Sequence, residues 1–315
     1  MLAKIAHELV TPKFLVVYTY LASVLFIHFR GKVRLRFSRQ LTEHSGILAP
    51  YNSLMYLFSK VPTTPFLDVN RFPELAPLRE NWETIAAEAK ALYENDGIRS
   101  SERNNDLAFL AFKKRGWKRF YIHWYDEPFQ SARELCPKTT ALVQSIPMLK
   151  SAAFTLLPPG AILGKHRDPF AGSLRYHLGL VTPNSDDCCI WVDGEKHSWR
   201  DGVDVVFDET CIHWAQNETD QARIIFFADI TRPLHTPILR GINNLVARYL
   251  IKQTKSHNVE GEPVGLLNRL TPVVWDVRCW LQELKKEHPP AYVGLKVLIA
   301  GTLLTGLFFG GRVFF

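Results

Sequence analysis

Residues 166–180 read HRDPFAGSLRYHLGL, a polar turn followed by a strand-like run. Arg175 and His177 are two positions apart in this run, so they share one face of a strand, while Leu174 and Leu178 occupy the opposite face. Two cationic or polar groups on one face indicate a pocket that takes an anion. The alternative interpretation is that this face is an outer, solvated one.

Short strand-like runs separated by Gly, Pro and Asn-Ser turns make up the sequence around this stretch. This pattern of short strands and turns is typical of a β-sandwich or jelly roll. Apolar residues at helical spacing over 78–92, with Gly97 after them, predict a helix packed on its outside. The predicted strands are 152–157, 174–181, 189–192, 202–207 and 223–230.

Two histidines and one carboxylate stand in an order that suits a metal ion. His166 and Asp168 flank a single residue, so both side chains can turn toward one point, and His213 follows the predicted strand 202–207. Two histidines and one carboxylate can occupy one face of Fe(II) and leave positions open for a co-substrate and dioxygen. The plainer interpretations are that His166 is a loop histidine, that Asp168 is a turn former before Pro169, and that His213 is a core histidine.

Arg223 opens the apolar run 224–228, ten residues after His213. A buried arginine is costly unless a carboxylate pairs with it, and the nearest acids in the sequence, Asp220 and Asp229, are not its direct neighbours. A carboxylate supplied by a ligand can bind a guanidinium in a bidentate manner. Arg223 therefore fits the cation that iron oxygenases need for the far carboxylate of 2-oxoglutarate.

Apolar segments near both ends predict contact with a membrane. Residues 14–29 carry no acidic or basic charge, and five basic residues follow them within ten positions. By the positive-inside rule this predicts an anchor with the main domain in the cytoplasm; a cleaved signal peptide and a buried core helix are the alternatives. Residues 297–311 predict a second span or an interfacial helix. The basic amphipathic pattern of 238–252 is typical of an interfacial helix.

Net charge and cysteine content indicate the surroundings in which the protein works. The net charge is +7 with a pI near 9.1, which suggests anionic surroundings. The five cysteines are odd in number and include no C-x-x-C pair, which argues against a disulfide scaffold and for a reducing compartment.

Taken together, the motifs resemble the aspartyl/asparaginyl β-hydroxylase family over roughly residues 115–233. The motifs are FTLLPPG (154–160), HRDPF (166–170), LRYHLGL (174–180), FDE (207–209), His213 and Arg223. The resemblance implies a mainly β fold with flanking helices, built on a double-stranded β-helix core of the jelly-roll, cupin-like kind, here with membrane-anchoring helices at the termini. It also implies that His166 and His213 hold iron.

The implied cofactors are Fe(II), 2-oxoglutarate as co-substrate, and O2. The family's contacts to 2-oxoglutarate carry over to Arg223 and Thr155 for the distal carboxylate, and to Arg175 and His177 for the other end. The predicted metal-binding and catalytic residues are His166, Asp168 and His213.

One departure narrows the resemblance. The family pattern implies that its peptide hydroxylases have glycine where this chain has Asp168. The HRDPFAGSLRYHLGL run, the apolar segments at both ends and the expected cytoplasmic domain together resemble the bacterial lipid A 2-hydroxylase branch. Its members hydroxylate the 2-position of a secondary acyl chain, releasing succinate and CO2. The implied substrate is lipid A or a related membrane lipid, at the bacterial inner membrane with the catalytic domain facing the cytoplasm. The alternatives are a peptidyl aspartyl/asparaginyl β-hydroxylase and a non-catalytic membrane-bound sensor.

The predicted organisation has four parts. These are an anchor with its basic flank (1–40), the dioxygenase domain (62–233), an amphipathic membrane-proximal region (234–290) and a C-terminal hydrophobic segment (291–315). Basic residues interleaved with aromatic ones suit a phosphorylated headgroup, with a solvated strand edge as the alternative: Lys113, Lys114, Arg115, Lys118 and Arg119. No nucleic acid partner is expected beside membrane segments, although such interleaving can signal one, and no oligomeric state is predicted.

Overall fold

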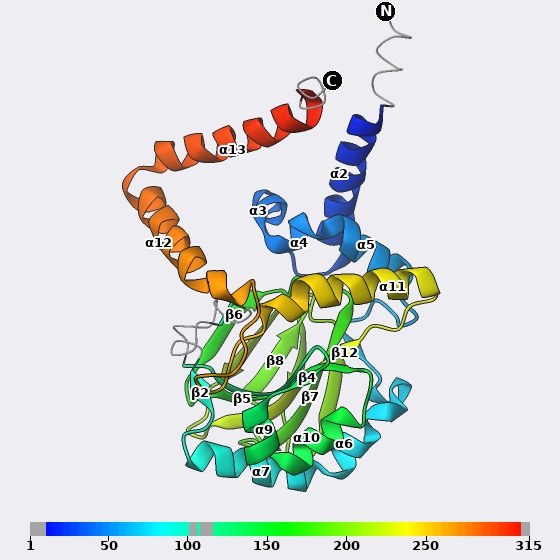
Figure 1. Ribbon diagram of the computed structural model, residues 1–315, viewed down its shortest axis with the longest axis vertical. Helices are drawn as coiled ribbons and strands as arrows, with labels where there is room; N and C mark the ends of the chain where they lie inside the picture. The colour runs from blue at the N-terminus through cyan, green and yellow to red at the C-terminus, as the bar shows by residue number, and fades with distance from the viewer. Residues whose placement is uncertain (1–10, 101–105, 108–115, 310–315) are drawn as a thin grey trace, which may run out of the picture. The chain divides into compact units, whose positions relative to one another are not determined.

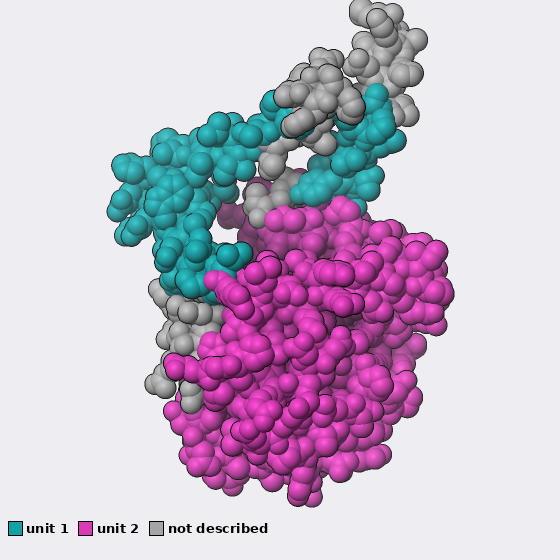
Figure 2. Space-filling model, viewed as in Figure 1, with its two compact units in different colours: residues 1–23, 270–315 teal, residues 24–269 magenta. Residues whose placement is uncertain are grey.

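The structure is a computed structural model that describes residues 11–100, 106–107 and 116–309. The chain divides into two compact units: residues 24–269 form one, and residues 1–23 with 270–315 form the other (Figure 2). The segment 234–269 therefore belongs to the same unit as the strands. The four-part organisation expected from the sequence stays a prediction.

A large antiparallel sheet of eight strands has the order β1-β10-β7-β12-β5-β3-β2, with β4 paired to β3 (Figure 1). Its strands are β1 (Phe66–Leu67), β2 (Arg99–Ser100), β3 (Lys118–Trp124), β4 (Glu127–Pro128), β5 (Leu149–Leu157), β7 (Ser173–Val181), β10 (Asp204–Phe207) and β12 (Arg223–Thr231). All five strands expected from the sequence are present, four in this sheet and one in the second sheet, with their ends shifted by a few residues.

A second antiparallel sheet of four strands has the order β6-β11-β8-β9. Its strands are β6 (Ile162–His166), β8 (Cys188–Val192), β9 (Glu195–Ser198) and β11 (His213–Asn217). The two sheets form a jelly-roll core with helices around it, which confirms the predicted double-stranded β-helix. The free cysteines agree with the prediction that no disulfide scaffold is present: Cys136, Cys188, Cys189, Cys211 and Cys279.

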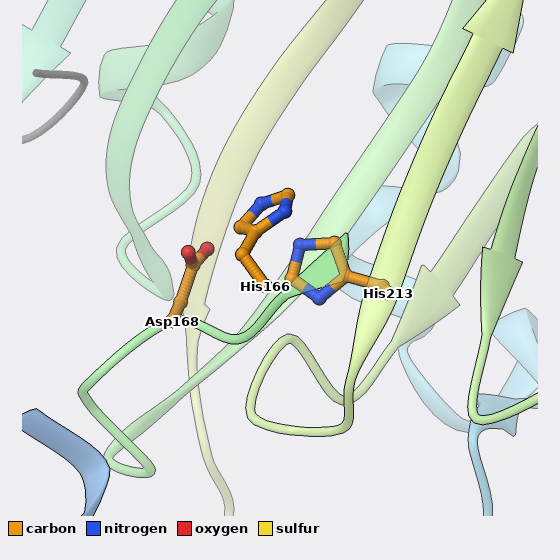
Figure 3. A group of neighbouring side chains, drawn as sticks. All are labelled: His166, Asp168 and His213. Atoms are coloured by element: carbon orange, nitrogen blue, oxygen red, sulfur yellow. The ribbon is translucent and has the colours of Figure 1, made fainter. Parts of the chain in front are cut away.

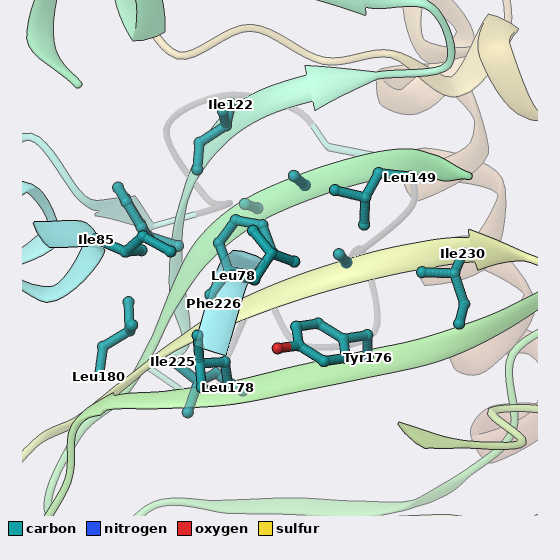
Figure 4. Packing of buried hydrophobic residues seen from close by; sticks show 14 of the residues in the cluster. Leu78, Ile85, Ile122, Leu149, Tyr176, Leu178, Leu180, Ile225, Phe226 and Ile230 are labelled. Atoms are coloured by element: carbon teal, nitrogen blue, oxygen red, sulfur yellow. The ribbon is translucent and has the colours of Figure 1, made fainter. Parts of the chain in front are cut away.

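Side chains alternate between two buried environments along the central strands of the large sheet. Tyr176, Leu178 and Phe226 point into the apolar core shown in Figure 4, where a fully buried side chain of this size contributes ~1.5–3 kcal/mol. Their strand neighbours Arg175 and His177 face the other way but are also buried. The solvated-face interpretation of these two residues is therefore wrong, because both faces of β7 are covered.

Helices cover the outer face of the large sheet (Figure 1). They are α6 (Ala76–Glu80), α7 (Trp82–Glu94), α9 (Gln130–Leu135) and α10 (Pro137–Gln144), with short 3-10 turns at Val69–Arg71 and Pro73–Leu75 before them. The helix predicted over 78–92 is present but divides at Asn81 into α6 and α7. α7 buries Ile85, Ala89 and Leu92 against the sheet, as its spacing predicts.

The segment after β12 packs back onto the same unit. It forms α11 (Pro237–Val246), a π-helical turn (Ala247–Ile251) and a 3-10 turn (Lys252–Thr254). Beyond them, Ser256 accepts a hydrogen bond from Arg119, whose guanidinium is fully enclosed and paired with Asp106 at 2.6 Å. The prediction that Arg119 contacts a headgroup is therefore wrong, because its charge is already satisfied inside the fold. Residues 113–115 lie outside the described residues.

Further helices form towards both chain ends, and only some of them are apolar. They are α2 (Pro12–Arg30), α3 (Phe37–Thr42), α4 (His44–Ile47) and α5 (Ala49–Leu57) at one end, and a 3-10 turn (Asn268–Leu270), α12 (Thr271–Glu287) and α13 (Pro289–Phe309) at the other. Within the part of the chain that the structure describes, α2 alone has the length and composition to cross a membrane. α13 contains most of the second apolar segment, and its spanning a bilayer stays a prediction.

Candidate metal and co-substrate site

His166 and His213 meet because of the strand register in the small sheet. His166 ends β6, His213 begins β11, and the two residues are partners across these antiparallel strands, with ring centroids 4.2 Å apart. Asp168 follows in the loop after β6. One ligand atom from each of the three lies within 4.8 Å of the others, and the side chains converge on one point (Figure 3).

Backbone carbonyl groups fix the tautomers of both histidines. Nδ1 of His166 lies 2.7 Å from the carbonyl oxygen of Gly164, and Nδ1 of His213 lies 2.9 Å from that of Cys211. A carbonyl group only accepts, so each Nδ1 carries the hydrogen and each Nε2 carries the lone pair that a metal ion needs. Burial lowers the pKa of His166 and lowers that of His213 to about 3, which keeps both rings neutral near pH 7.

Arg175 is surrounded by three carboxylates. Its Nη2 donates to Asp168 Oδ2 at 2.8 Å and to Glu209, and its Nε lies 2.9 Å from Asp229 Oδ1. Burial opposes ionisation of Asp168, but Arg175 and the two histidines lower its pKa below the ordinary value. Burial instead raises the pKa of Glu209 and of Asp229. Arg175 thus holds Asp168 in its ionised form, on the side where the histidines stand.

A cavity of about 460 Å³, counting its open mouth, joins these groups. The remaining polar side chains in its wall are those of Thr155, His177 and Arg223, and Trp117 and Trp199 also reach it. Most of the rest of the wall is apolar: Leu163, Ile190, Phe207, Ala215, Ile225 and Phe227. All seven predicted site residues therefore border a single cavity.

Arg223 presents a buried charge without a counterion. Its side chain is 2% exposed, and within the described part of the chain it makes no hydrogen bond or ion pair; its guanidinium carbon lies 4.4 Å from the centre of the Trp199 ring. Burial lowers the pKa of Arg223 to about 10, so it is still a cation at pH 7. A buried cation of this kind fits a carboxylate supplied from outside the protein.

Two further polar groups of the cavity have no partner among the described residues. These are the Thr155 hydroxyl and both ring nitrogens of His177. Thr155 is the strand partner of Ile225, next but one to Arg223 in β12, and His177 is the strand partner of Phe227. Buried polar atoms are normally satisfied, so this wall of the cavity is prepared for a polar ligand.

Sequence reasoning missed part of this site. Glu209 lies in the quoted FDE motif, and Asp229 lies on the same face of β12 as Arg223, but neither was connected to Arg175. The face of Asp229 follows from the strand period of two. Its pairing with Arg175 depends on the register of β7 against β12, which a single sequence does not specify. Trp199 lines the cavity, although its sequence context favours core packing over a place in the site.

Comparisons with known proteins show which family the chain resembles. The family model described as Aspartyl/Asparaginyl beta-hydroxylase matches residues 79–233. The ornithine lipid ester-linked acyl 2-hydroxylase of Rhizobium tropici is 33% identical over 199 residues, which are 61% of this chain and 69% of that protein. The human aspartate beta-hydroxylase domain-containing protein 2 is 27% identical over 193 residues, 57% of this chain and 50% of that protein.

The chain belongs to the aspartyl/asparaginyl β-hydroxylase family. It is therefore a hydroxylase of the 2-oxoglutarate-dependent class, and the family implies Fe(II) as the metal. The chain spans only about half the length of the human relative. Among solved structures, a prolyl-4-hydroxylase from Pseudomonas putida aligns with a TM-score of 0.33 and 19% identity, over 49% of this chain and 87% of that protein.

Proposed function

We propose that this protein hydroxylates the 2-position of a fatty acyl chain in a membrane lipid, with 2-oxoglutarate and O2 as co-substrates. One oxygen atom enters the acyl C–H bond, and the other enters succinate as 2-oxoglutarate loses CO2. The secondary acyl chain of lipid A is the substrate that the sequence resemblance implies, and the acyl chain of an ornithine lipid is the one that the Rhizobium relative suggests.

The observation that carries this proposal is the unpaired Arg223 in the same cavity as the histidine and carboxylate cluster. A set of metal-binding side chains alone would suit many reactions. A buried arginine without a counterion, together with an unsatisfied threonine hydroxyl, additionally requires a small anionic ligand beside the metal. 2-Oxoglutarate meets this requirement because it carries a second carboxylate at the far end of a short chain.

The donor set fits Fe(II), since neutral imidazole and carboxylate groups suit it better than the thiolates of a structural zinc site. His166, Asp168 and His213 would hold the ion, which would supply the activation of dioxygen. Arg223 and Thr155 would bind the distal carboxylate of 2-oxoglutarate. His177 would contact its other end together with Arg175, whose Nη1 has no hydrogen bond among the described residues.

The apolar part of the wall suits an acyl chain. Leu163, Ile190 and Ile225 line the same cavity as the two histidines, so a methylene group can enter it along an apolar wall. The same side chains exclude water from the reacting position, which limits side reactions. A peptide aspartate or asparagine would instead call for a cation or an amide partner at this wall.

The proposed location rests on the candidate anchor. α2 has the properties of a membrane span, and basic residues after it favour the cytoplasmic side for the catalytic unit. We therefore propose the bacterial inner membrane, with the cavity on the cytoplasmic side. A lipid whose acyl chain is accessible from that leaflet would be within reach of the site.

Mass spectrometry of whole lipid extracts tests the proposal. A bacterial host that makes both lipid A and ornithine lipids, and lacks this activity, would express the wild-type chain, Asp168→Ala, or Glu218→Ala. Glu218 is an exposed residue outside the cavity and serves as the control. We expect one added oxygen on an acyl chain with wild type and Glu218→Ala, and none with Asp168→Ala. Unchanged lipids of both kinds, with well-expressed wild type, would contradict the proposal.

A further inference from the structure

The strip of unit 24–269 formed by α5 and α11 has an apolar outer surface. The two helices lie beside each other (Figure 1). Tyr51 donates to Asn243 at 2.7 Å, and Ser59 forms a β-bridge with Leu234. We call the exposed apolar side chains on them, together with Tyr249 in the π-helical turn after α11, the α5/α11 surface: Leu54, Leu57, Ile238, Ile242, Leu245 and Tyr249.

The part contributed by α11 is a regular stripe. Ile238, Ile242 and Leu245 follow one another at intervals of four and three residues, so they share one side of α11. Tyr249 follows four residues later, in the π-helical turn after α11. Ile238 is 77% exposed, Leu245 is 56% exposed and Tyr249 is 67% exposed, whereas Leu239 is only 8% exposed and faces the protein. α11 therefore has two apolar sides, and only one of them is used by the fold.

Another amphipathic helix of the same unit shows the ordinary pattern. α7 also buries an apolar stripe, but apart from Tyr93 its exposed side chains are charged or small, and they include Glu83, Ala87, Lys90 and Glu94. Isolated exposed apolar residues are normal on a soluble surface, and a contiguous set indicates a partner. The α5/α11 surface is such a set, so solvent is not its expected environment.

The charges around the surface favour a lipid bilayer as the partner. Lys60, Arg240 and Arg248 are exposed at its borders, and residues 47–60 and 237–252 contain no aspartate or glutamate. An apolar stripe flanked only by cations is the pattern of helices that lie in the interface of anionic membranes. The last turns of α2, the candidate span, belong to this same unit.

We propose that the α5/α11 surface inserts into the headgroup region of an anionic membrane and holds unit 24–269 against the bilayer. This contact is separate from the α2 anchor and does not depend on the chemistry of the cavity. A single helical anchor can still tilt and turn in the bilayer, and the catalytic unit turns with it. A second contact would restrict it to one orientation toward the lipid surface.

Spin labels on the full-length chain in nanodiscs test the proposal. Four native cysteines are buried, so Cys279→Ser gives a background with little unwanted labelling. Labels would be placed through Ile242→Cys and Leu245→Cys, and through Ala87→Cys at an exposed position of α7 as the control. Nanodiscs of phosphatidylethanolamine with phosphatidylglycerol are expected to make the first two labels more accessible to oxygen than to a water-soluble nickel complex. The label at position 87 is expected to show the opposite preference.

Two outcomes would overturn the proposal. Greater accessibility of the Ile242 and Leu245 labels to nickel would show that the surface is solvated. Immobilised labels that neither reagent reaches would show that protein covers it, from another copy or from another part of this chain. The double variant Arg240→Gln/Arg248→Gln tests the role of charge. Without this double substitution, the surface should insert more deeply in nanodiscs that contain phosphatidylglycerol than in nanodiscs of phosphatidylcholine alone. The double variant should insert equally in both.

Discussion

Arg175 and Arg223 border the same cavity, and both are buried, yet their surroundings are opposite. Arg175 contacts Asp168, Glu209 and Asp229, whereas Arg223 contacts no carboxylate among the described residues and lies over the Trp199 ring. The charge of the first arginine is balanced without a ligand. The second is buried at a cost that the folded chain alone does not offset.

This difference separates two roles that the sequence resemblance had grouped together as co-substrate binding. Arg175 is foremost a positioning residue, because its Nη2 fixes the carboxylate of Asp168 next to the histidines. Arg223 is a binding residue whose partner must come from outside the chain. Substitutions at the two positions should therefore change different properties of the protein.

The largest effect is expected from Arg175→Met. Removing this cation leaves the buried Glu209 and Asp229 and the partly exposed Asp168 without their counterion, and breaking a buried ion pair in this way costs ~3–5 kcal/mol. Metal affinity should also fall by roughly 10- to 100-fold, since a residue that orients a ligand is lost. Denaturant unfolding and a metal titration on the full-length chain measure both quantities. A variant as stable as wild type, with unchanged metal affinity, would contradict the positioning role assigned to Arg175.

A different pattern is expected from Arg223→Met. The free energy of unfolding without ligand should stay the same or rise, because an unpaired buried cation is replaced by an apolar side chain of similar length. The KM for 2-oxoglutarate should rise by about 30-fold or more, which corresponds to ~2 kcal/mol or more for a buried charge pair. Arg223→Lys serves as the control, because it keeps the charge but loses the bidentate geometry. It should fall between wild type and Arg223→Met, and unchanged KM values in both would contradict the assignment.

The smallest effect is expected from Thr155→Val, which removes one hydroxyl and keeps the volume of the side chain. A hydrogen bond to a charged group contributes ~1.5–3 kcal/mol, and the low end applies here because the carboxylate keeps its contact with Arg223. The KM for 2-oxoglutarate should therefore rise by roughly 10-fold, with little change in metal affinity. Steady-state kinetics at several 2-oxoglutarate concentrations measure this change. A larger loss than that of Arg223→Met would reverse the proposed ranking of the two contacts.

Much of the fold could be predicted from residue patterns, and the failures have physical causes. The strands β5, β7 and β12 are apolar enough to be recognised directly. β6 and β11 are short and contain charged or polar residues, so their periodicity does not stand out. These two strands bring His166 and His213 together, which means that the site was recognised from its ordered motifs and not from its strands.

The partners of the charged residues could also be predicted only in part. The sequence shows that Arg223 lacks an acidic neighbour, and the structure agrees, because its neighbours in the fold are Trp199 and the cavity. For Arg119, the sequence neighbours did not reveal its partners, and the predicted headgroup contact was wrong. Its partner Asp106 is thirteen residues away, and its partner Ser256 comes from a segment that packs back onto β3. Pairing of this kind depends on tertiary contacts that no local pattern encodes.

The most direct test is a calorimetric comparison of two ligands on the metal-loaded chain under anaerobic conditions, with Mn(II) in place of Fe(II). One ligand is 2-oxoglutarate, and the other is 2-oxopentanoate, which has the same carbon chain without the distal carboxylate. Wild type should bind 2-oxoglutarate about 30-fold more tightly or better, and Arg223→Met should bind both ligands with nearly equal affinity. The same preference for 2-oxoglutarate in Arg223→Met as in wild type would show that Arg223 is not the partner of the distal carboxylate.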